Sequence, residues 1–216
     1  MTASGNGRWN DSVAMTIWRG KDPLVLASQS RARKMLLDNA GIAFEALPAD
    51  IDERAIQENS GLSAPADIAL LLAREKALCV SSRRPERFVV GADQTLALGD
   101  RLFGKPAGRD QAAEQLRALA GHVHELHSAV AVAHDGKILF ADTSVARMSM
   151  RPLREDGIGA YLDQAGEAVT TSVGAYQLEG LGVHLFERID GDHFPILGLP
   201  LLSLLAFLRR ENLLAI

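Results

Sequence analysis

One stretch of the sequence, residues 24–37, constrains the fold more strongly than any other. It begins with the apolar run Leu24-Val25-Leu26, turns through small polar residues, and continues with basic residues followed by leucines. This order is typical of a buried strand, a tight loop and a helix. We therefore expect an architecture in which this strand–helix unit begins an α/β domain.

The first turn of this predicted helix carries three basic side chains. Backbone N–H groups at a helix start lack internal partners and carry partial positive charge. Together with Arg31, Arg33 and Lys34 they would form a site for phosphate. The alternative is an ordinary strand–helix junction, in which Ser30 caps the helix and the basic residues face solvent. This stretch by itself leaves both interpretations open.

The composition limits the classes of function. A chain of 216 residues with 47% hydrophobic content is typical of one globular domain with a substantial core. The net charge of -4 provides no basic field for nucleic acid, and no apolar run reaches the roughly 18 to 20 residues that span a bilayer. The single cysteine, Cys79, excludes an internal disulfide framework and a Cys-rich zinc site.

The first 22 residues differ in character from the rest of the chain. They contain no continuous apolar core and do not resemble a signal peptide. We expect residues 1–22 to form a disordered N-terminal extension and residues 23–216 to form a single domain. A soluble, cytoplasmic protein is the resulting expectation.

Hydrophobic periodicity predicts alternating helices and strands along the domain. The helices are expected at residues 30–39, 63–81, 110–119, 155–163 and 199–210. The strands are expected at residues 24–26, 42–47, 88–98, 126–133, 138–150 and 183–189. The Asp135-Gly136 pair predicts a hairpin. The expected fold class is therefore α/β, with a mixed, twisted sheet flanked by helices.

Carboxylates in two places are candidates for a metal or catalytic site. Asp50, Asp52 and Glu53 lie within four residues. A solvated acidic turn is the common explanation of such a cluster, and oxygen ligands for a divalent cation are the alternative. Asp93 follows a buried strand, where a charge is costly unless it is paired, bound to a metal or open to a cleft.

Two lysines have different local settings. Lys76 lies off the stripe of larger apolar residues that we assign to the inner face of helix 63–81, so we expect it to face solvent. Lys105 stands before Pro106, which favours an extended backbone at the lysine and holds its position.

Together these residues indicate phosphoanhydride chemistry. Several cations for a polyphosphate and a few carboxylates for Mg²⁺ are what such hydrolysis requires. No P-loop is present, because Gly104-Lys105 is followed by Pro106 rather than Ser or Thr. No Gly-x-Ser-x-Gly elbow is present either, so acyl-transfer catalysis has little support.

The chain resembles the Maf family of nucleoside triphosphate pyrophosphatases, which share a broad fold group with the inosine triphosphatases. Matching motifs run in order along nearly the whole chain. They are Leu26-Ala27-Ser28-Gln29-Ser30-Arg31-Ala32-Arg33-Lys34, Asp50-Ile51-Asp52-Glu53, Ala73-Arg74-Glu75-Lys76-Ala77, Gly91-Ala92-Asp93-Gln94-Thr95, Gly104-Lys105-Pro106, Leu119-Ala120-Gly121-His122-Val123-His124, Gly174-Ala175-Tyr176 and Leu197-Gly198-Leu199-Pro200-Leu201. The resemblance implies two lobes with a cleft between them.

The resemblance also implies roles for individual residues. Asp93 would act as the general base for the attacking water and would contact the divalent cation, Mg²⁺ or Mn²⁺, that Glu53 holds. Lys76, Lys105 and Arg33 would bind the triphosphate together with Ser28. Water attack at the α-phosphorus would then give a nucleoside monophosphate and pyrophosphate.

The positions that distinguish substrates in the family depart from its most common pattern. Members that prefer dTTP and UTP have Arg, Thr and Gln at the places of Ala32, Gln94 and Glu179. Gln94 and Glu179 instead resemble the subgroup that prefers 7-methyl-GTP, where a carboxylate would suit a positively charged methylated base. Arg31 stands where the family usually has proline and is a candidate to replace the arginine lost at Ala32.

Three functional hypotheses follow from the resemblance. The first is a metal-dependent pyrophosphatase for 7-methyl-GTP or another modified nucleotide, and the second is a dTTP/UTP-type pyrophosphatase. The third is a nucleotide-sensing regulator of septum formation with little turnover. The resemblance further implies a homodimer, and neither nucleic acid nor a membrane is expected as a partner.

Overall fold

The computed structural model describes residues 17–216. Its strands are β1 (Leu24–Leu26), β2 (Phe44–Ala46), β3 (Val89–Leu98), β4 (Arg101–Phe103), β5 (Val123–His134), β6 (Lys137–Met150) and β7 (Phe186–Asp190). Its α-helices are α1 (Arg31–Asn39), α2 (Glu53–Ser60), α3 (Pro65–Arg83), α4 (Arg109–Leu119), α5 (Glu155–Ala165), α6 (His193–Ile196) and α7 (Leu201–Arg210). Short 3₁₀ helices cover Gly166–Thr170, Val173–Ala175 and Leu181–Leu185.

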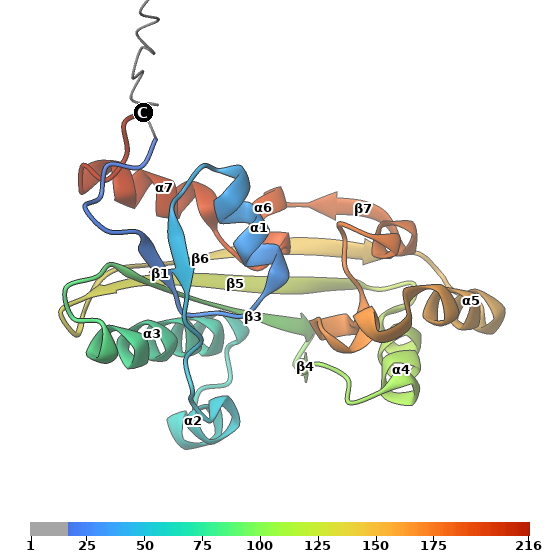
Figure 1. Ribbon diagram of the computed structural model, residues 1–216. Helices are drawn as coiled ribbons and strands as arrows, with labels where there is room; N and C mark the ends of the chain where they lie inside the picture. The colour runs from blue at the N-terminus through green and yellow to red at the C-terminus, as the bar shows by residue number, and fades with distance from the viewer. Residues whose placement is uncertain (1–16) are drawn as a thin grey trace, which may run out of the picture.

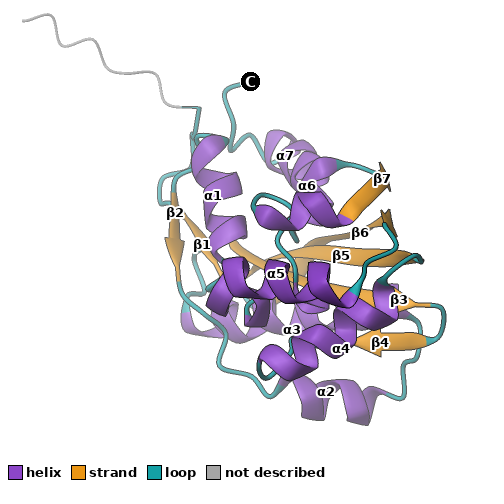
Figure 2. Cartoon of the chain, turned by 90° about the vertical axis from the view of Figure 1, so that its right-hand side faces the viewer, coloured by secondary structure: helices purple, strands orange, loops and turns teal. Residues whose placement is uncertain are grey.

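One seven-stranded sheet runs through the described part of the chain (Figure 1). Its order is β2-β1-β3-β5-β6-β7, and β4 pairs with β3. Strand β1 is parallel to β2 and β3, and the remaining pairs are antiparallel. Helix α3 lies on one face of the sheet, and α1, α6 and α7 lie on the other (Figures 1 and 2). The predicted α/β class with a mixed sheet flanked by helices is confirmed.

Two hydrophobic cores form along this single sheet. The first joins β1, α1 and α7 to the beginning of β3, including Val90 and Ala92. The second joins α4, α5 and the Tyr176 segment to the end of β3, including Leu96. Between them β3 and β5 carry polar residues, namely Asp93, Gln94, Thr95, His127 and Ser128. The two cores correspond to the predicted lobes, with a polar band across the sheet where they meet.

The polar band coincides with a break in strand pairing along one edge of β3. Strand β1 pairs with this edge only as far as Leu26 opposite Val90, and β4 begins to pair with it at Leu96 opposite Phe103. The opposite edge is paired with β5 without interruption from residue 89 to residue 97. In the described part of the chain, residues 91–95 therefore have one edge without a neighbouring strand, and we call this stretch the open edge of β3.

The opening unit folds as its sequence indicates. Strand β1 is fully buried, and the Ser30 hydroxyl accepts a hydrogen bond from the Arg33 N–H, as the N-cap interpretation requires. Helix α1 ends before Gly41, whose φ of 66° is a left-handed conformation that favours glycine. Local signals were sufficient here because strand, cap and glycine act within a few residues of one another.

Two sequence predictions need correction, and a third lies mostly outside the described residues. Residues 50–53 are not only an acidic turn, because Asp52 caps α2 and Glu53 begins it. The predicted strand 183–189 begins later, as β7 at Phe186, after a 3₁₀ helix. The extension predicted for residues 1–22 lies mostly outside the described residues, yet Trp18 is buried in the first core and bridges to Leu214.

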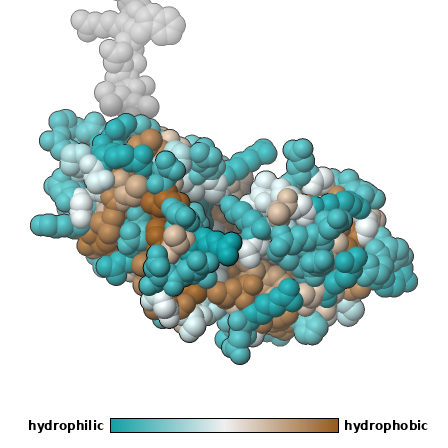
Figure 3. All heavy atoms as spheres, turned by 90° about the horizontal axis from the view of Figure 1, so that it is seen from below, coloured by the Kyte–Doolittle hydropathy of each residue, from teal (hydrophilic) through white to brown (hydrophobic). Residues whose placement is uncertain are grey.

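The described surface shows a mixed character. Hydrophilic residues cover most of the face in Figure 3, with separate hydrophobic patches among them. Within residues 17–216, no helix has the length and apolar character needed to cross a bilayer.

Candidate active site

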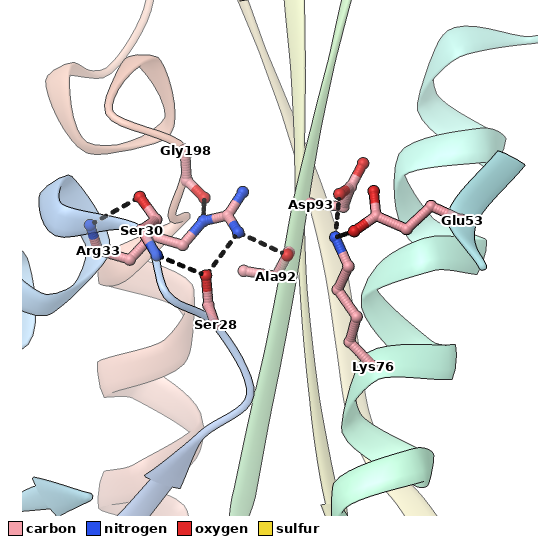
Figure 4. A network of polar contacts seen from close by, with 8 residues as sticks. All are labelled: Ser28, Ser30, Arg33, Glu53, Lys76, Ala92, Asp93 and Gly198. Atoms are coloured by element: carbon pink, nitrogen blue, oxygen red, sulfur yellow. Dashed lines mark hydrogen bonds and ion pairs between the residues drawn. The ribbon is translucent and has the colours of Figure 1, made fainter. Parts of the chain in front are cut away.

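A lysine between two carboxylates forms the charged part of the candidate site (Figure 4). The Lys76 Nζ lies 2.6 Å from Asp93 Oδ1 and 2.8 Å from Glu53 Oε1. Lys76 and Asp93 are buried, at 8% and 7% exposed, whereas about half of the Glu53 side chain reaches solvent. The arrangement joins α2, α3 and β3 at the open edge.

The burial of Lys76 contradicts the predicted solvent-facing lysine. The prediction placed larger apolar residues on the inner face of α3. Ile68 and Leu72 are buried, but so are Ala69, Ala73 and Ala77. Lys76 lies one turn from Ala73 on this face, so it points at the sheet. The stripe of larger apolar residues is only part of the buried face, and small residues form the part that adjoins Lys76.

A close approach between α3 and β3 explains why small residues are needed. A Cβ atom built on Gly91 would lie 2.1 Å from the Ala73 carbonyl oxygen and 2.7 Å from the Ala77 nitrogen. Such contacts are far inside van der Waals distance, so Gly91 permits the helix backbone to reach the sheet. Gly91 and Asp93 are two residues apart and share a face of β3. The same packing therefore brings Lys76 to Asp93.

The carboxyl group of Asp93 has a raised pKa and one oxygen atom without a hydrogen-bond partner in the described chain. Burial raises the pKa of its carboxyl above the ordinary range, while the positive charges of Lys76 and Arg33 act in the opposite direction. No hydrogen bond from residues 17–216 reaches its second oxygen, Oδ2, and this atom is not enclosed. Asp93 thus has one oxygen fixed by Lys76 and one available to a ligand, with increased basicity.

Arg33 forms the second part of the site, across β3 from Lys76 (Figure 4). Its Nε donates to the Gly198 carbonyl at 2.7 Å, and its Nη1 donates to the Ala92 carbonyl at 2.8 Å and to Ser28 Oγ at 3.1 Å. Burial lowers the pKa of the guanidinium, while the charges of Asp93 and Glu53 raise it. Within the described chain Nη2 has no hydrogen-bond partner, so it is free for an anion.

Ser28 links the opening loop to Arg33. Its Oγ accepts hydrogen bonds from the Ser30 N–H at 3.2 Å and from Arg33 Nη1. Both bonds use the oxygen as acceptor, so the hydroxyl proton is left for another acceptor such as a phosphate oxygen.

Gln94 lies on the face of β3 opposite to Asp93, since adjacent strand residues point in opposite directions. Its Nε2 is 2.9 Å from Ser128 Oγ, 2.9 Å from the Pro195 carbonyl oxygen and 3.1 Å from the Ile196 carbonyl oxygen. The segment 195–198 therefore contacts Gln94 at one end and Arg33 at the other. We refer to residues 195–198 as the strap.

The structure brings together only part of the predicted site. Ser28, Arg33, Glu53, Lys76 and Asp93 converge, with Gln94 beside them. Ala32 instead packs against the first hydrophobic core. The side chains of Arg31, Lys105 and Glu179 are exposed, and within residues 17–216 they form no hydrogen bond or ion pair to this cluster.

Sequence reasoning missed the residues that hold the site in shape. Ser128 and the strap carbonyls lie far along the chain from Gln94, and no local pattern joins them. The start of α2 did have a signal, because Asp52 is a favoured N-cap residue and its carboxylate accepts from the Ala55 N–H.

The donor set is compatible with a divalent cation that binds together with phosphate. Among residues 17–216, no three His, Cys, Asp or Glu side chains are placed to hold a metal by themselves. Mg²⁺ is commonly bound through one or two carboxylates, waters and substrate phosphates. Glu53 and Asp93 provide such a pair of carboxylates, so the residues fit this type of site.

The chain is similar to proteins that carry functional names. A protein of Bradyrhizobium diazoefficiens named "Nucleoside triphosphate pyrophosphatase" is 72% identical over 202 residues, covering 94% of this chain and all of that protein. A protein of Rhizobium etli named "7-methyl-GTP pyrophosphatase" is 52% identical over 189 residues, covering 86% of this chain and 94% of that protein.

A solved structure of a HAM1 protein from Coxiella burnetii aligns with 59% of this chain and 72% of its own, at 18% identity and a TM-score of 0.38. The family model described as "Maf-like protein" matches residues 23–211. This match covers most of the chain, which therefore belongs to the Maf family.

Proposed function

We propose that this chain is a nucleoside triphosphate pyrophosphatase, which converts a nucleoside triphosphate to a nucleoside monophosphate and pyrophosphate. The observation that carries the proposal is the buried Asp93 carboxylate, fixed by Lys76 through one oxygen and open at the other. Pure binding of a nucleotide has little need of such a base. The names of the similar proteins quoted above support the same activity.

Asp93 acts on the attacking water. Its free Oδ2 accepts a proton while the water oxygen bonds to the α-phosphorus, and the bond from that phosphorus to the pyrophosphate oxygen breaks. The raised pKa makes the carboxylate a stronger base than an ordinary Asp. Lys76 holds the other oxygen, so the base keeps its orientation during attack.

The cationic residues stabilise the triphosphate. Arg33 Nη2 and the Ser28 hydroxyl proton are the unused donors on the strap side of β3, and both can bind phosphate oxygens. Lys105 follows β4, whose pairing with β3 ends at Leu96 next to the open edge. Its exposed ammonium is available to neutralise charge that develops on the leaving pyrophosphate.

A divalent cation, Mg²⁺ or Mn²⁺, would be held by Glu53 and Asp93 together with the phosphates. When bound, it supplies positive charge that stabilises the phosphoryl oxygens in the transition state. The compatible donor set and the family membership support this part of the proposal.

The candidate substrate is 7-methyl-GTP. Support comes from the relative of that name and from Gln94 and Glu179, which resemble the residues of the corresponding subgroup. A carboxylate at Glu179 would accept hydrogen bonds from guanine and favour the positive charge of the methylated ring. A dTTP/UTP preference is the alternative at the same site.

The test is hydrolysis of a nucleotide panel by the full chain with Mg²⁺, with Mn²⁺ and with a chelator. We expect pyrophosphate and the monophosphate as products, a dependence on the cation, and the highest kcat/KM for 7-methyl-GTP. Release of inorganic phosphate instead would contradict attack at the α-phosphorus. Tight binding without turnover would select the nucleotide-sensing regulator. The homodimer, the cytoplasmic location and a role in septum formation stay predictions.

A further inference from the structure

The amide nitrogen of Gln94 is surrounded by three oxygen atoms. These are the Ser128 hydroxyl and the carbonyls of Pro195 and Ile196, at 2.9 to 3.1 Å. An amide nitrogen has two protons to donate. Both are therefore used within the protein, and Gln94 has no donor left for a ligand.

The orientation of this amide follows from the same contacts. Turning the amide by 180° would place its carbonyl oxygen against two backbone carbonyls, which only accept hydrogen bonds. Ser128 cannot correct this mismatch, because its hydroxyl donates to the Pro195 carbonyl at 2.6 Å. All three neighbours thus act as acceptors toward Gln94, and the turned orientation is excluded.

The other end of the amide is open. The Gln94 carbonyl oxygen has no hydrogen-bond partner among residues 17–216, and it is not one of the enclosed unpaired atoms, which belong to Gln115, His124 and His127. Gln94 itself is only partly buried. A ligand at this face of β3 therefore meets an acceptor.

We propose that Ser128 is a positioning residue for substrate selection, which together with the strap fixes Gln94 so that this side chain offers the nucleobase an acceptor and no donor. The inference rests on the proposed function, because it places the base of the nucleotide beside Gln94. Ser128 is fully buried and cannot contact the nucleotide. It acts through Gln94 and through the strap.

An acceptor at Gln94 favours a nucleobase with an accessible N–H donor. It disfavours a base in which that donor lies between two acceptor atoms. Guanine has adjacent donors, N1–H and the exocyclic amino group. Methylation at N7 adds positive charge to the ring and strengthens the N1–H donor. Uracil and thymine have a single N–H between two carbonyl oxygens, which an acceptor at Gln94 would repel.

The first experiment uses the wild-type chain and requires no variant. Its preferred nucleotide is compared with derivatives in which each N–H donor of the base is methylated or absent. Loss of one hydrogen bond should lower kcat/KM about tenfold for at least one derivative. Equal kcat/KM for all of them would overturn the proposal, since Gln94 would then have no donor to accept from.

The second experiment measures nucleotide selectivity, defined as the ratio of kcat/KM between the preferred and the least accepted nucleotide. Ser128→Ala should lower this ratio about fivefold, as expected for one hydrogen bond. Ser128→Cys, which keeps the volume, should lower it in the same direction. In a Gln94→Leu background Ser128→Ala should cause no further change, because the amide that it positions is absent.

Ser81→Ala is the matched control. Ser81 is also fully buried and accepts one hydrogen bond, from the Gly136 N–H at the hairpin. We expect this variant to keep the wild-type selectivity. A general loss of packing would affect both serine variants, whereas positioning of Gln94 concerns Ser128 alone.

Two results would overturn the proposal: unchanged selectivity in both Ser128 variants, or a full-sized Ser128→Ala effect in the Gln94→Leu background. If the Ser128 variants do not fold, the derivative series is repeated in Gln94→Leu, in which the loss for at least one derivative should disappear. Failure of the proposed function appears separately, as absence of turnover by wild type. In that case the same ratios are measured as Kd values for triphosphates with a methylene bridge between the α- and β-phosphorus atoms.

Discussion

The two faces of β3 differ in how they hold their polar side chains. On the α3 face, Asp93 is fixed by the ammonium of Lys76, and burial raises its pKa. On the strap face, Gln94 is fixed by a hydroxyl and two backbone carbonyls, all of them neutral. Side-chain alternation thus places the proposed base and the proposed recognition residue on opposite faces of one strand, although they are adjacent in sequence.

The two faces are also built by different packing. The α3 face depends on alanines and Gly91, which let the helix approach until Lys76 reaches the sheet. The strap face depends on a loop whose carbonyl oxygens point at Gln94 and Arg33. A change on the first face should therefore alter charge and rate, and a change on the second should alter orientation and selectivity.

The largest effect is expected for Asp93→Asn. The amide has nearly the same shape but cannot take a proton from water, so kcat should fall about a thousandfold or more. The free energy of unfolding should change by only about 1 kcal/mol, because a buried charge is replaced by a neutral group while Lys76 keeps Glu53. Steady-state kinetics and chemical denaturation measure the two quantities. Asp100→Asn, at an exposed turn, is the control, and retained activity in Asp93→Asn would refute the role of the base.

Lys76→Met should lower kcat/KM about a hundredfold and also shift its pH dependence. Lys76 lowers the pKa of Asp93, so its removal raises that pKa further. The base is active when deprotonated, so the acid limb of the kcat/KM profile should move to higher pH. Stability should decrease as the pH rises through this raised pKa, because the unpaired carboxylate then becomes charged.

Lys137→Met, at an exposed position of the hairpin, is the control for Lys76→Met. It should leave both the activity and the pH profile unchanged. The acid limb of the kcat/KM profile of Lys76→Met is the deciding observation. If it stays in place or moves to lower pH, Lys76 does not set the charge state of Asp93.

Arg33→Lys tests the strap face and should lower kcat/KM between about tenfold and a hundredfold. Lysine keeps the charge but cannot contact the Gly198, Ala92 and Ser28 oxygens together while leaving a donor for phosphate. The acid limb should shift less than in Lys76→Met, because a positive charge remains at this position. Arg188→Lys, at the exposed end of the sheet, should have no effect. If Arg33→Lys had the kinetics of wild type, the site would need only a positive charge at this position and not the several donors of a guanidinium.

The smallest effect on rate is expected for Gly91→Ala, which tests the packing that unites the two faces. The new methyl group would meet the backbone of α3, so the helix must move away from the sheet. We expect a loss of about 2 kcal/mol in the free energy of unfolding and a decrease of about tenfold in activity. Gly157→Ala, whose Cβ would meet nothing, should be neutral or slightly stabilising. If Gly91→Ala had the same stability and activity as Gly157→Ala, the close packing of α3 against β3 would not be what positions Lys76.

The location of Asp93 at the sheet could be predicted because it follows a continuous apolar run that is typical of a buried strand. The location of Lys76 could not, because the part of the buried face of α3 that adjoins it consists of alanines. Small residues contribute little to a hydrophobic pattern, although they permit the closest contact. Burial of a charge is also disfavoured in general, and only the ion pairs with Asp93 and Glu53 make it acceptable here.

Local sequence is sufficient to predict the strand–loop–helix opening, the class of the fold and the types of residue that a triphosphate site requires. These depend on local propensity, on caps such as Ser30 and on motifs within a few residues. Tertiary packing specifies which of these residues meet, the burial of Lys76 and the acceptor that Gln94 exposes. Those facts depend on contacts between segments as distant as Gln94 and Ile196, and no local pattern contains the geometry of such a contact.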